Sequence, residues 1–327
     1  MTLATIARPS LPTFPTLNND PDVLAQLLAD KRSINTRRAY AGDVRDFFKT
    51  ITGQLSSRSG VTQFLQLPER DAVALVLKWK AIMMSGEGRS KPLAEATINR
   101  RLAAIKSLVV MGQNLGVCDF NLARIKGETV AKYRDTTGID AETFKQILST
   151  CNRETVAGKR DYALLRLLWG NALRRNEVSQ LSIGDFNTRA GALQILGKGK
   201  GTQQQSIDVG PATVQAIKEW LAVRPGSAAE NDPLFVALDF ATIGHRITGD
   251  GIYKLVQRKT KAAGIDKQMS PHRIRHSAIT AALDATDGNV RKVQKLSRHK
   301  NLNTLMIYDD NRGRDQLDVT ALLDGMF

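Results

Sequence analysis

Helical periodicity runs through most of this chain and constrains its fold more than any other feature. From Asp22 to about Gly127, apolar residues recur at spacings of three and four, as they do along Ala72–Met84. Alternation of apolar and polar residues, typical of strands, marks two short segments, Ala192–Leu196 and Gln205–Val209. We therefore expect a mainly α-helical fold with one small β-sheet, of the α+β class.

Breaks in this pattern divide the chain into regions. Residues 1–21 hold four of the ten prolines and no helical period, which predicts a disordered lead-in. The stretch 126–135 also lacks a period, and predicts a linker between a helical domain over 22–127 and a second domain over 136–327. Further helical patterns in the second domain lie at Asp161–Trp169, Glu177–Leu181, Pro211–Ala222, Gly251–Ala263, His272–Leu283, Asn289–Leu296 and Gln316–Phe327.

The charge balance predicts a polyanionic partner. Lys and Arg number 47 against 32 Asp and Glu, which gives a formal net charge of +15. Phosphate backbones attract such a protein through counterion release, so nucleic acid is the first partner to consider. Charge alone also fits a basic protein without such a partner, or one that binds an anionic membrane surface.

Neither secretion nor membrane insertion is expected. The longest apolar runs fall far short of the roughly 20 residues that cross a bilayer, and residues 1–20 lack the basic-then-apolar order of a signal peptide. The two cysteines, Cys118 and Cys151, cannot form a disulfide framework, which points to a reducing compartment. We expect a cytoplasmic protein.

Histidines and arginines gather near the C-terminal end of the sequence. A helix that begins at Pro271 places His272 and Arg275 three residues apart, on one face and directed at one ligand. This segment differs from a zinc-protease helix because it has no internal Glu, and its arginines would repel a cation. We therefore expect no metal and no other cofactor. A guanidinium can clamp two phosphate oxygens, so a phosphate is the expected ligand.

Two earlier basic features are weak when taken singly. Arg174 follows an apolar helical pattern, and an arginine in that position is more often a solvated surface residue. The turn Gly197–Gly201 joins the two predicted strands, either as a flexible hairpin tip or as a turn that delivers Lys198 or Lys200 into a groove.

In their order along the chain, these residues resemble the active-site signature of the tyrosine recombinases, the phage integrase family that includes the Xer proteins. Ala172-Leu173-Arg174-x-x-Glu177 resembles the family's Gly-Leu-Arg-x-x-Glu box, and Gly197-Lys198-Gly199 resembles its β-hairpin lysine. Ser270-Pro271-His272-x-x-Arg275-His276 resembles the third box, and His299 followed nine residues later by Tyr308 resembles the fourth. The likeness extends over about residues 22–327.

The resemblance implies site-specific DNA strand exchange through a covalent 3′-phosphotyrosyl intermediate. It implies Tyr308 as the nucleophile, His272 as its general base or proton relay, and Lys198 as the acid that protonates the leaving 5′-hydroxyl. The transition-state charge would be neutralised by two arginines, and a second histidine would hydrogen-bond the scissile phosphate. The implied catalytic set is Arg174, Lys198, His272, Arg275, His299 and Tyr308.

Three local departures from the family pattern stand in this sequence. Ala172 replaces the usual Gly, and Ser297-Arg298 stands where Leu-Gly commonly precedes the histidine. The hairpin continues with Gln203-Gln204-Gln205, without the further basic residue often seen there. No catalytic position is missing.

The resemblance also implies a two-domain clamp on double-stranded DNA, with residues 22–127 as the core-DNA-binding domain. The predicted DNA contacts are Arg100, Arg101, Lys106, Lys200, Lys254, Arg258, Lys259 and Arg273. A homotetramer on paired sites is implied, with a second recombinase as an alternative partner. The apolar stripe after Tyr308 would dock on a neighbouring protomer or fold back onto its own domain. Two other functions stay open: DNA relaxation of the type IB topoisomerase kind, and DNA binding by a catalytically silent protein.

Overall fold

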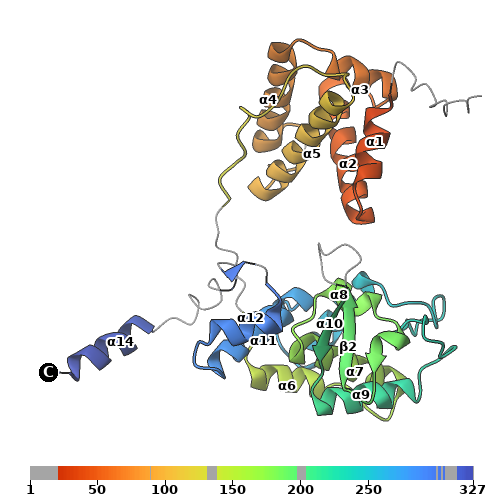
Figure 1. Ribbon diagram of the computed structural model, residues 1–327, viewed down its shortest axis with the longest axis vertical. Coiled ribbons are helices and arrows are strands. Elements are labelled where there is room, and N and C mark those ends of the chain that lie inside the picture. Colours follow the sequence, from red (N-terminus) through yellow and green to blue (C-terminus); the bar gives the residue numbers. More distant parts are fainter. Residues whose placement is uncertain are drawn as a thin grey trace, which may run out of the picture. The chain divides into compact units, whose positions relative to one another are not determined.

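The computed structural model describes residues 21–88, 90–130, 138–196, 204–299, 301–302, 305 and 315–326. The chain divides into two compact units, Met1–Lys132 and Tyr133–Phe327, and each is described by itself (Figure 1). Within the described ranges, no helix combines the length and the apolar character that a membrane span requires.

The first unit is a bundle of helices. They are α1 (Val23–Asp30), α2 (Ile34–Thr52), α3 (Arg58–Leu65), α4 (Glu69–Ser85) and α5 (Glu95–Asn114). Helix α5 contacts α1, α2 and α4, and its buried stripe Leu102, Ile105 and Leu108 has the spacing of three that a helix places on one face. Edge-on aromatic contacts from Phe47 to Phe64 and Trp79 complete this core.

Residues after α5 remain attached to this first unit. Asn99 donates from Nδ2 to the Glu128 carbonyl at 2.8 Å and accepts the Glu128 backbone N–H at 2.7 Å. Lys80 donates to the carbonyl of Lys126 at 2.9 Å. Contacts of the first unit thus reach beyond Gly127, whereas the second half of the predicted linker, residues 131–135, lies outside the described residues.

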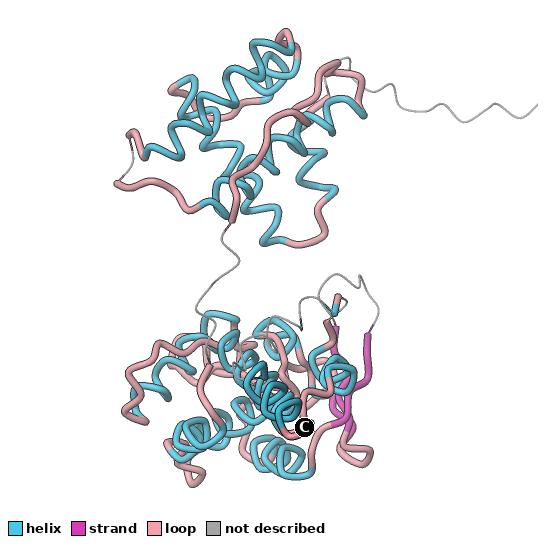
Figure 2. Tube along the Cα trace, turned by 90° about the vertical axis from the view of Figure 1, so that its left-hand side faces the viewer, coloured by secondary structure: helices cyan, strands magenta, loops and turns pink. Residues whose placement is uncertain are grey.

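The second unit is also mainly helical, with one small antiparallel sheet. Its helices include α6 (Ala141–Ser149), α7 (Val156–Gly170), α8 (Arg175–Gln180), α9 (Pro211–Leu221), α10 (Gly249–Ala262), α11 (Pro271–Asp284), α12 (Val290–Ser297) and α14 (Asp315–Asp324), with a 3₁₀ turn, η1, at Ile183–Asp185. Its strands are β1 (Phe186–Asn187), β2 (Ala192–Leu196) and β3 (Gln204–Asp208), in the order β1-β2-β3. Figure 2 shows these strands together at one side of the unit.

Helix α7 forms the centre of the second unit and contacts α6, α8, α9 and α11. Its residues Leu164, Leu165, Leu167 and Leu168 are all fully buried, because neighbours cover this helix on several sides. On β2, Leu193 and Ile195 are buried while Gln194 and Leu196 are exposed, which is the period of two expected of a strand with one face on the core. The predicted α+β class, mainly helical with a small sheet, is confirmed.

The end of α7 determines where the first part of the site lies. The helix stops at Gly170, and the chain turns through Asn171 and Ala172 into α8. Ala172 has a backbone φ of 44°, in the left-handed region that a side chain with a Cβ seldom adopts. Ala172 is buried in a small apolar cluster with residues of α11 and α12, among them Ile279 and Val293. This turn therefore brings the start of α8 against α11 and α12.

Candidate active site

The structure describes four of the six predicted catalytic residues: Arg174, His272, Arg275 and His299. Lys198, Tyr308 and the predicted DNA contact Lys200 lie outside the described residues. The four come from three places in the fold: Arg174 precedes α8, His272 and Arg275 both lie in the first turns of α11, and His299 follows α12.

Arg174 is held at the start of α8 by Glu177. The Glu177 carboxylate accepts the backbone N–H of Arg174 through Oε2 at 2.8 Å, and Arg174 Nη1 through Oε1 at 2.8 Å. A glutamate three residues into a helix commonly accepts this backbone N–H, which explains the Arg-x-x-Glu spacing. Burial raises the pKa of Glu177, but the Arg298 charge and the Arg174 bonds outweigh it, so the pKa lies below its ordinary value.

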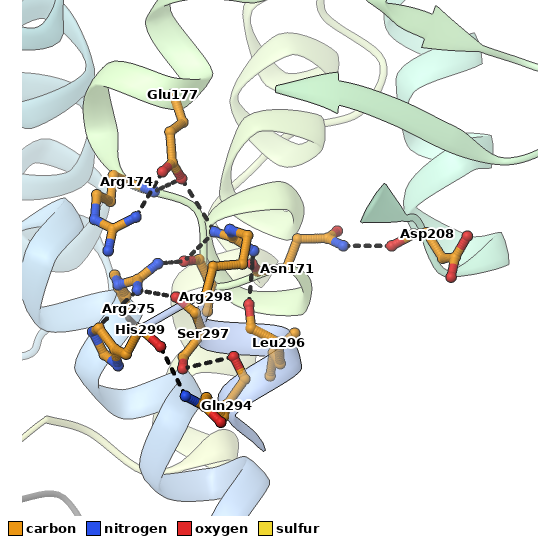
Figure 3. A network of polar contacts seen from close by, with 11 residues as sticks. Asn171, Arg174, Glu177, Asp208, Arg275, Gln294, Leu296, Ser297, Arg298 and His299 are labelled. Atoms are coloured by element: carbon orange, nitrogen blue, oxygen red, sulfur yellow. Dashed lines mark hydrogen bonds and ion pairs between the residues drawn. The ribbon is translucent and has the colours of Figure 1, made fainter. Parts of the chain in front are cut away.

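Arg275 lies beneath the turn before Arg174, with only 2% of its surface exposed. Its guanidinium donates to the carbonyl of Ala172 through Nη1 and to the carbonyl of Ser297 through Nη2. The second nitrogen also lies 3.3 Å from His299 Nε2. One arginine of α11 thus joins the turn after α7 to the turn after α12, as Figure 3 shows.

His299 is partly buried beside these arginines. Burial lowers its pKa to about 4, and the charges of Arg275, Arg174 and Arg298 act in the same direction. Its backbone carbonyl accepts a hydrogen bond from Gln294 Nε2 at 3.0 Å. A neutral imidazole can hydrogen-bond a phosphate oxygen without adding charge to the site.

His272 is exposed in the first turn of α11. This helix begins at Pro271, as predicted, and the Ser270 side chain caps its N-terminus. Its Nε2 lies 2.9 Å from Nε2 of His276, one helical turn further on. Burial lowers the pKa of His276 to about 4, followed by the charges of His272, Arg275 and His299. Because one nitrogen of the pair must donate and the other accept, the protonation of Nε2 on His276 and that on His272 depend on each other.

Sequence reasoning assigned no role to Arg298, and the structure places it within the site. Its side chain is 7% exposed and donates to the Glu177 carboxylate at 3.1 Å. The same guanidinium bonds the carbonyls of Asn171 at 3.0 Å and Leu296 at 2.7 Å. Its only signal in the sequence was that it departs from the family pattern.

These groups together form a cationic site suited to an anion. Two arginines bond a single carboxylate, a third arginine is linked to them through the Ala172 carbonyl, and two imidazoles lie at the margin. Within the described ranges, no group of three or more His, Cys, Asp or Glu side chains is arranged to hold a metal ion. Paired guanidiniums stabilise the charge that develops on a phosphodiester during displacement at phosphorus.

The predicted DNA contacts of the first unit are engaged within that unit. Arg100 bonds Asp43 of α2, Arg101 bonds Asp46, and Lys106 donates to the Ile125 carbonyl at 2.5 Å. Burial raises the pKa of Asp43, and the charges of Arg100 and Arg101 oppose that rise. These bonds give the three side chains a structural role, and their contact with DNA stays a prediction.

The predicted contacts of the second unit differ in exposure. Lys254 and Arg258 are exposed on α10, with Arg258 Nη2 3.4 Å from Asp161. Lys259 is largely buried, 3.6 Å from the same carboxylate, and donates to the Thr150 carbonyl at 3.1 Å. Arg273 donates to the Gln268 carbonyl at 2.8 Å. Lys254 and Arg258 are therefore more available to a phosphate than Lys259.

Comparison with known proteins decides the family. The profile of the phage integrase family matches residues 138–314. Tyrosine recombinase slr0733 from Synechocystis sp. (strain ATCC 27184 / PCC 6803 / Kazusa) is 48% identical over 314 residues, which cover 95% of this chain and 98% of that protein. The chain belongs to the phage integrase family. It is a site-specific tyrosine recombinase, an enzyme that cuts and rejoins DNA, as the resemblance implied.

Similarity of this tyrosine recombinase to Xer proteins is visible in sequence and in fold. XerC of Haemophilus influenzae (strain 86-028NP) is 29% identical over 222 residues, covering 68% of this chain and 72% of XerC. The structure of the XerH site-specific recombinase bound to a palindromic difH substrate has a TM-score of 0.64 at 20% identity, covering 92% of this chain and 84% of that one. A lambda integrase tetramer bound to a Holliday junction has a TM-score of 0.60 at 12% identity, covering 89% and 76%. These two structures share the fold of this recombinase.

Proposed function

We propose that this recombinase cleaves DNA by attack of Tyr308 on a phosphodiester held by Arg174, Arg275 and His299. The observation that carries the proposal is the convergence of the two arginines and His299 on the turns after α7 and α12, beside the Glu177 carboxylate. The same order of residues in the sequence supports it, and this order places Tyr308 nine residues after His299.

Attack by Tyr308 transfers the phosphoryl group from the 5′ oxygen of the DNA to the tyrosine oxygen, and this step needs no free energy from a cofactor. The Tyr308 oxygen forms a bond to phosphorus, and the bond from phosphorus to the 5′ oxygen breaks with its electron pair on that oxygen. His272 takes the phenolic proton, and Lys198 gives a proton to the 5′ oxygen. A phenol with a pKa near 10 is a poor nucleophile near neutral pH, which is why an adjacent base is needed. Because the phosphotyrosyl bond keeps the energy of the phosphodiester, rejoining reverses these steps.

Double-stranded DNA is the proposed substrate, bound by both units, and a homotetramer on paired sites is the proposed assembly. XerH, which this chain resembles in fold, is described bound to difH substrate, and lambda integrase is described as a tetramer on a Holliday junction. The net charge of +15 supports the DNA contact. We place the protein in the cytoplasm, with its two buried free thiols, Cys118 and Cys151, as support.

The decisive experiment traps the covalent intermediate. After cleavage, a nicked DNA substrate loses the short fragment that carries the new 5′-hydroxyl, so that the wild-type protein accumulates as a covalent adduct on the 3′ phosphate of the remaining strand. Tyr308→Phe removes one hydroxyl, and we expect it to bind the same DNA within about twofold while forming no adduct. An adduct formed by the Phe variant would assign the nucleophile to another residue.

A further inference from the structure

Residue 298 has a backbone conformation that disfavours the side chain it carries. It caps the C-terminus of α12 with φ 57° and ψ 33°, and its N–H donates to the Gln294 carbonyl at 2.7 Å. This left-handed conformation at a helix end is the one in which glycine is most often found. An arginine at this position therefore has to be stabilised by the contacts of its side chain.

The Arg298 side chain turns back into the protein instead of extending into solvent (Figure 3). Its Nη1 donates to the carbonyls of Leu296 and Asn171, and its Nη2 donates to Glu177 Oε2 and, at 3.3 Å, to the carbonyl of Ala172. The planar fork of a guanidinium can reach several acceptors in one plane, whereas a lysine ammonium is a single point charge. One side chain thus connects the end of α12 to the turn that precedes α8.

The ion pair between Arg298 and Glu177 affects how much positive charge Arg174 presents to a phosphate. The Glu177 carboxylate is buried and bonds both Arg174 and Arg298. With Arg174 as its only cationic partner, the carboxylate would cancel the positive charge that the phosphate needs. Arg298 supplies a separate counter-ion, so that Arg174 keeps its charge for the substrate.

Arg298 also affects the orientation of Arg275, through the backbone carbonyls that Arg275 contacts. The Ala172 carbonyl accepts from Arg275 Nη1 as well as from Arg298 Nη2. The other nitrogen of Arg275 contacts Ser297 and His299, the residues on either side of Arg298. Two carbonyls that accept hydrogen bonds from Arg275 are therefore held by residue 298: that of Ala172 through its bond to Arg298, and that of Ser297 through the backbone turn.

We propose that Arg298 is a positioning residue for DNA cleavage, which orients Arg174 and Arg275 and neutralises Glu177 without touching the substrate. This inference rests on the phosphate-binding roles proposed above for Arg174 and Arg275.

The test measures single-turnover strand cleavage by Arg298→Gly on two substrates. Glycine suits the left-handed backbone, so the variant removes the side chain without straining the turn. On ordinary DNA we expect cleavage at least tenfold slower, with the DNA dissociation constant within about twofold of wild type. On DNA whose scissile phosphate is an uncharged methylphosphonate, we expect the loss to shrink below about threefold, because less charge needs neutralising. An equal loss on both substrates, or no loss on ordinary DNA, would overturn the proposal.

Two controls separate this inference from the proposed function. Arg174→Ala tests the phosphate-binding role itself, and a wild-type cleavage rate for this variant would refute the proposed site. If Arg174→Ala cleaves slowly while Arg298→Gly cleaves at the wild-type rate, only the Arg298 inference is refuted. Arg224 is the matched control, because its guanidinium also bonds carbonyls, those of Pro233, Pro225 and Ser227, and none of these bonds is to a site residue. Arg224→Ala should cleave within about twofold of wild type.

Circular dichroism at the assay temperature verifies folding. Should Arg298→Gly unfold, Arg298→Lys carries the test, because it keeps a charge opposite Glu177 but cannot reach all four acceptors. We expect it to cleave ordinary DNA at least threefold more slowly than wild type, with a smaller loss on the methylphosphonate. A rate within twofold of wild type on ordinary DNA would overturn the proposal.

Discussion

Lys198 is the residue to which proton delivery to the leaving 5′-hydroxyl is assigned. Replacing it with alanine should slow cleavage of an ordinary strand at least a hundredfold, the lower end of what a general acid contributes. A strand whose 5′ bridging oxygen is replaced by sulfur should be cleaved at close to the wild-type rate, because a thiolate leaves without protonation. The measurement is single-turnover cleavage of both strands by Lys198→Ala. Equal losses on both would assign Lys198 to DNA binding and direct attention to Lys200.

His276 links the stability of the second unit to pH. Its pKa is about 4 in the folded protein, mainly because it is buried, against an ordinary histidine pKa of 6.5. Between pH 6.5 and 4 the unfolded chain therefore binds more protons than the folded one, so the free energy of unfolding falls as the pH is lowered. His299, whose pKa is also about 4, acts in the same direction. We expect His276→Gln to reduce this pH dependence, measured by urea unfolding at several pH values.

His245 provides the control for this prediction, because its side chain is exposed and it lies outside the helices and strands. His245→Gln should leave the pH dependence as it is in the wild type. A slope that is equally steep with and without His276 would show that this histidine does not titrate differently in the two states.

The residues of the candidate site differ in how far the sequence alone could propose them. Arg174, His272, Arg275 and His299 could be predicted because each lies in a local motif and the motifs occur in a fixed order. Arg298 could not, because its acceptors Asn171 and Glu177 lie 127 and 121 residues earlier in the chain. The pairing of His272 with His276 needed the structure to show that the two rings meet.

At the scale of the element, local periodicity predicts most of the helices and the two longer strands, and it misses helix α6 and the two-residue strand β1. The predicted strand Ala192–Leu196 agrees with β2, and the predicted Gln205–Val209 differs from β3 by one residue at each end. The last helix was predicted from Gln316 and begins at Asp315. Strand β1 has two residues, too few to show an alternation, so its existence depends on pairing with β2.

The turn between α7 and α8 has a left-handed backbone conformation at Ala172 that the sequence did not predict. Ala172 lies at φ 44°, a conformation that costs an alanine about 1 kcal/mol relative to a glycine. Ala172→Gly removes this strain but loses a buried methyl group, about 0.8 kcal/mol, and makes the unfolded chain more flexible. We expect the free energy of unfolding to change by less than about 1 kcal/mol. Urea unfolding measures it.

Ala163 is the matched comparison, because it is equally buried but lies in the middle of α7 with ordinary helical geometry. Ala163→Gly relieves no strain, so it should lose about 1–2 kcal/mol, from helix propensity and the lost methyl group together. If the two glycine variants lost the same amount, the left-handed turn at Ala172 would carry no strain.

At the scale of the whole molecule, the net charge overstates the positive surface that DNA can meet. Arg101, Arg160 and Lys259 are all largely buried and paired with Asp46 or Asp161. Composition counts these side chains as cations, but each is held inside its own unit by these contacts. The sequence could predict a polyanionic partner from the sum of charges. It could not predict which cations face it, because that depends on long-range pairing.

Assembly is the last property at this scale, and it concerns α14. Leu322, Leu323 and Met326 are 68%, 53% and 73% exposed, a cluster of large apolar side chains near the C-terminal end of the described chain. Covering a side chain of this kind is worth about 1.5–3 kcal/mol, so a surface on a neighbouring protomer would gain stability by accepting them. We expect a protein without Leu317–Phe327 to remain folded by circular dichroism and to bind a single DNA site, but to fail to assemble tetramers on paired sites and to recombine poorly. The mass of the complex on paired sites measures this. Tetramers formed by the truncated protein would refute docking between protomers, and loss of folding would show that the segment packs on its own domain.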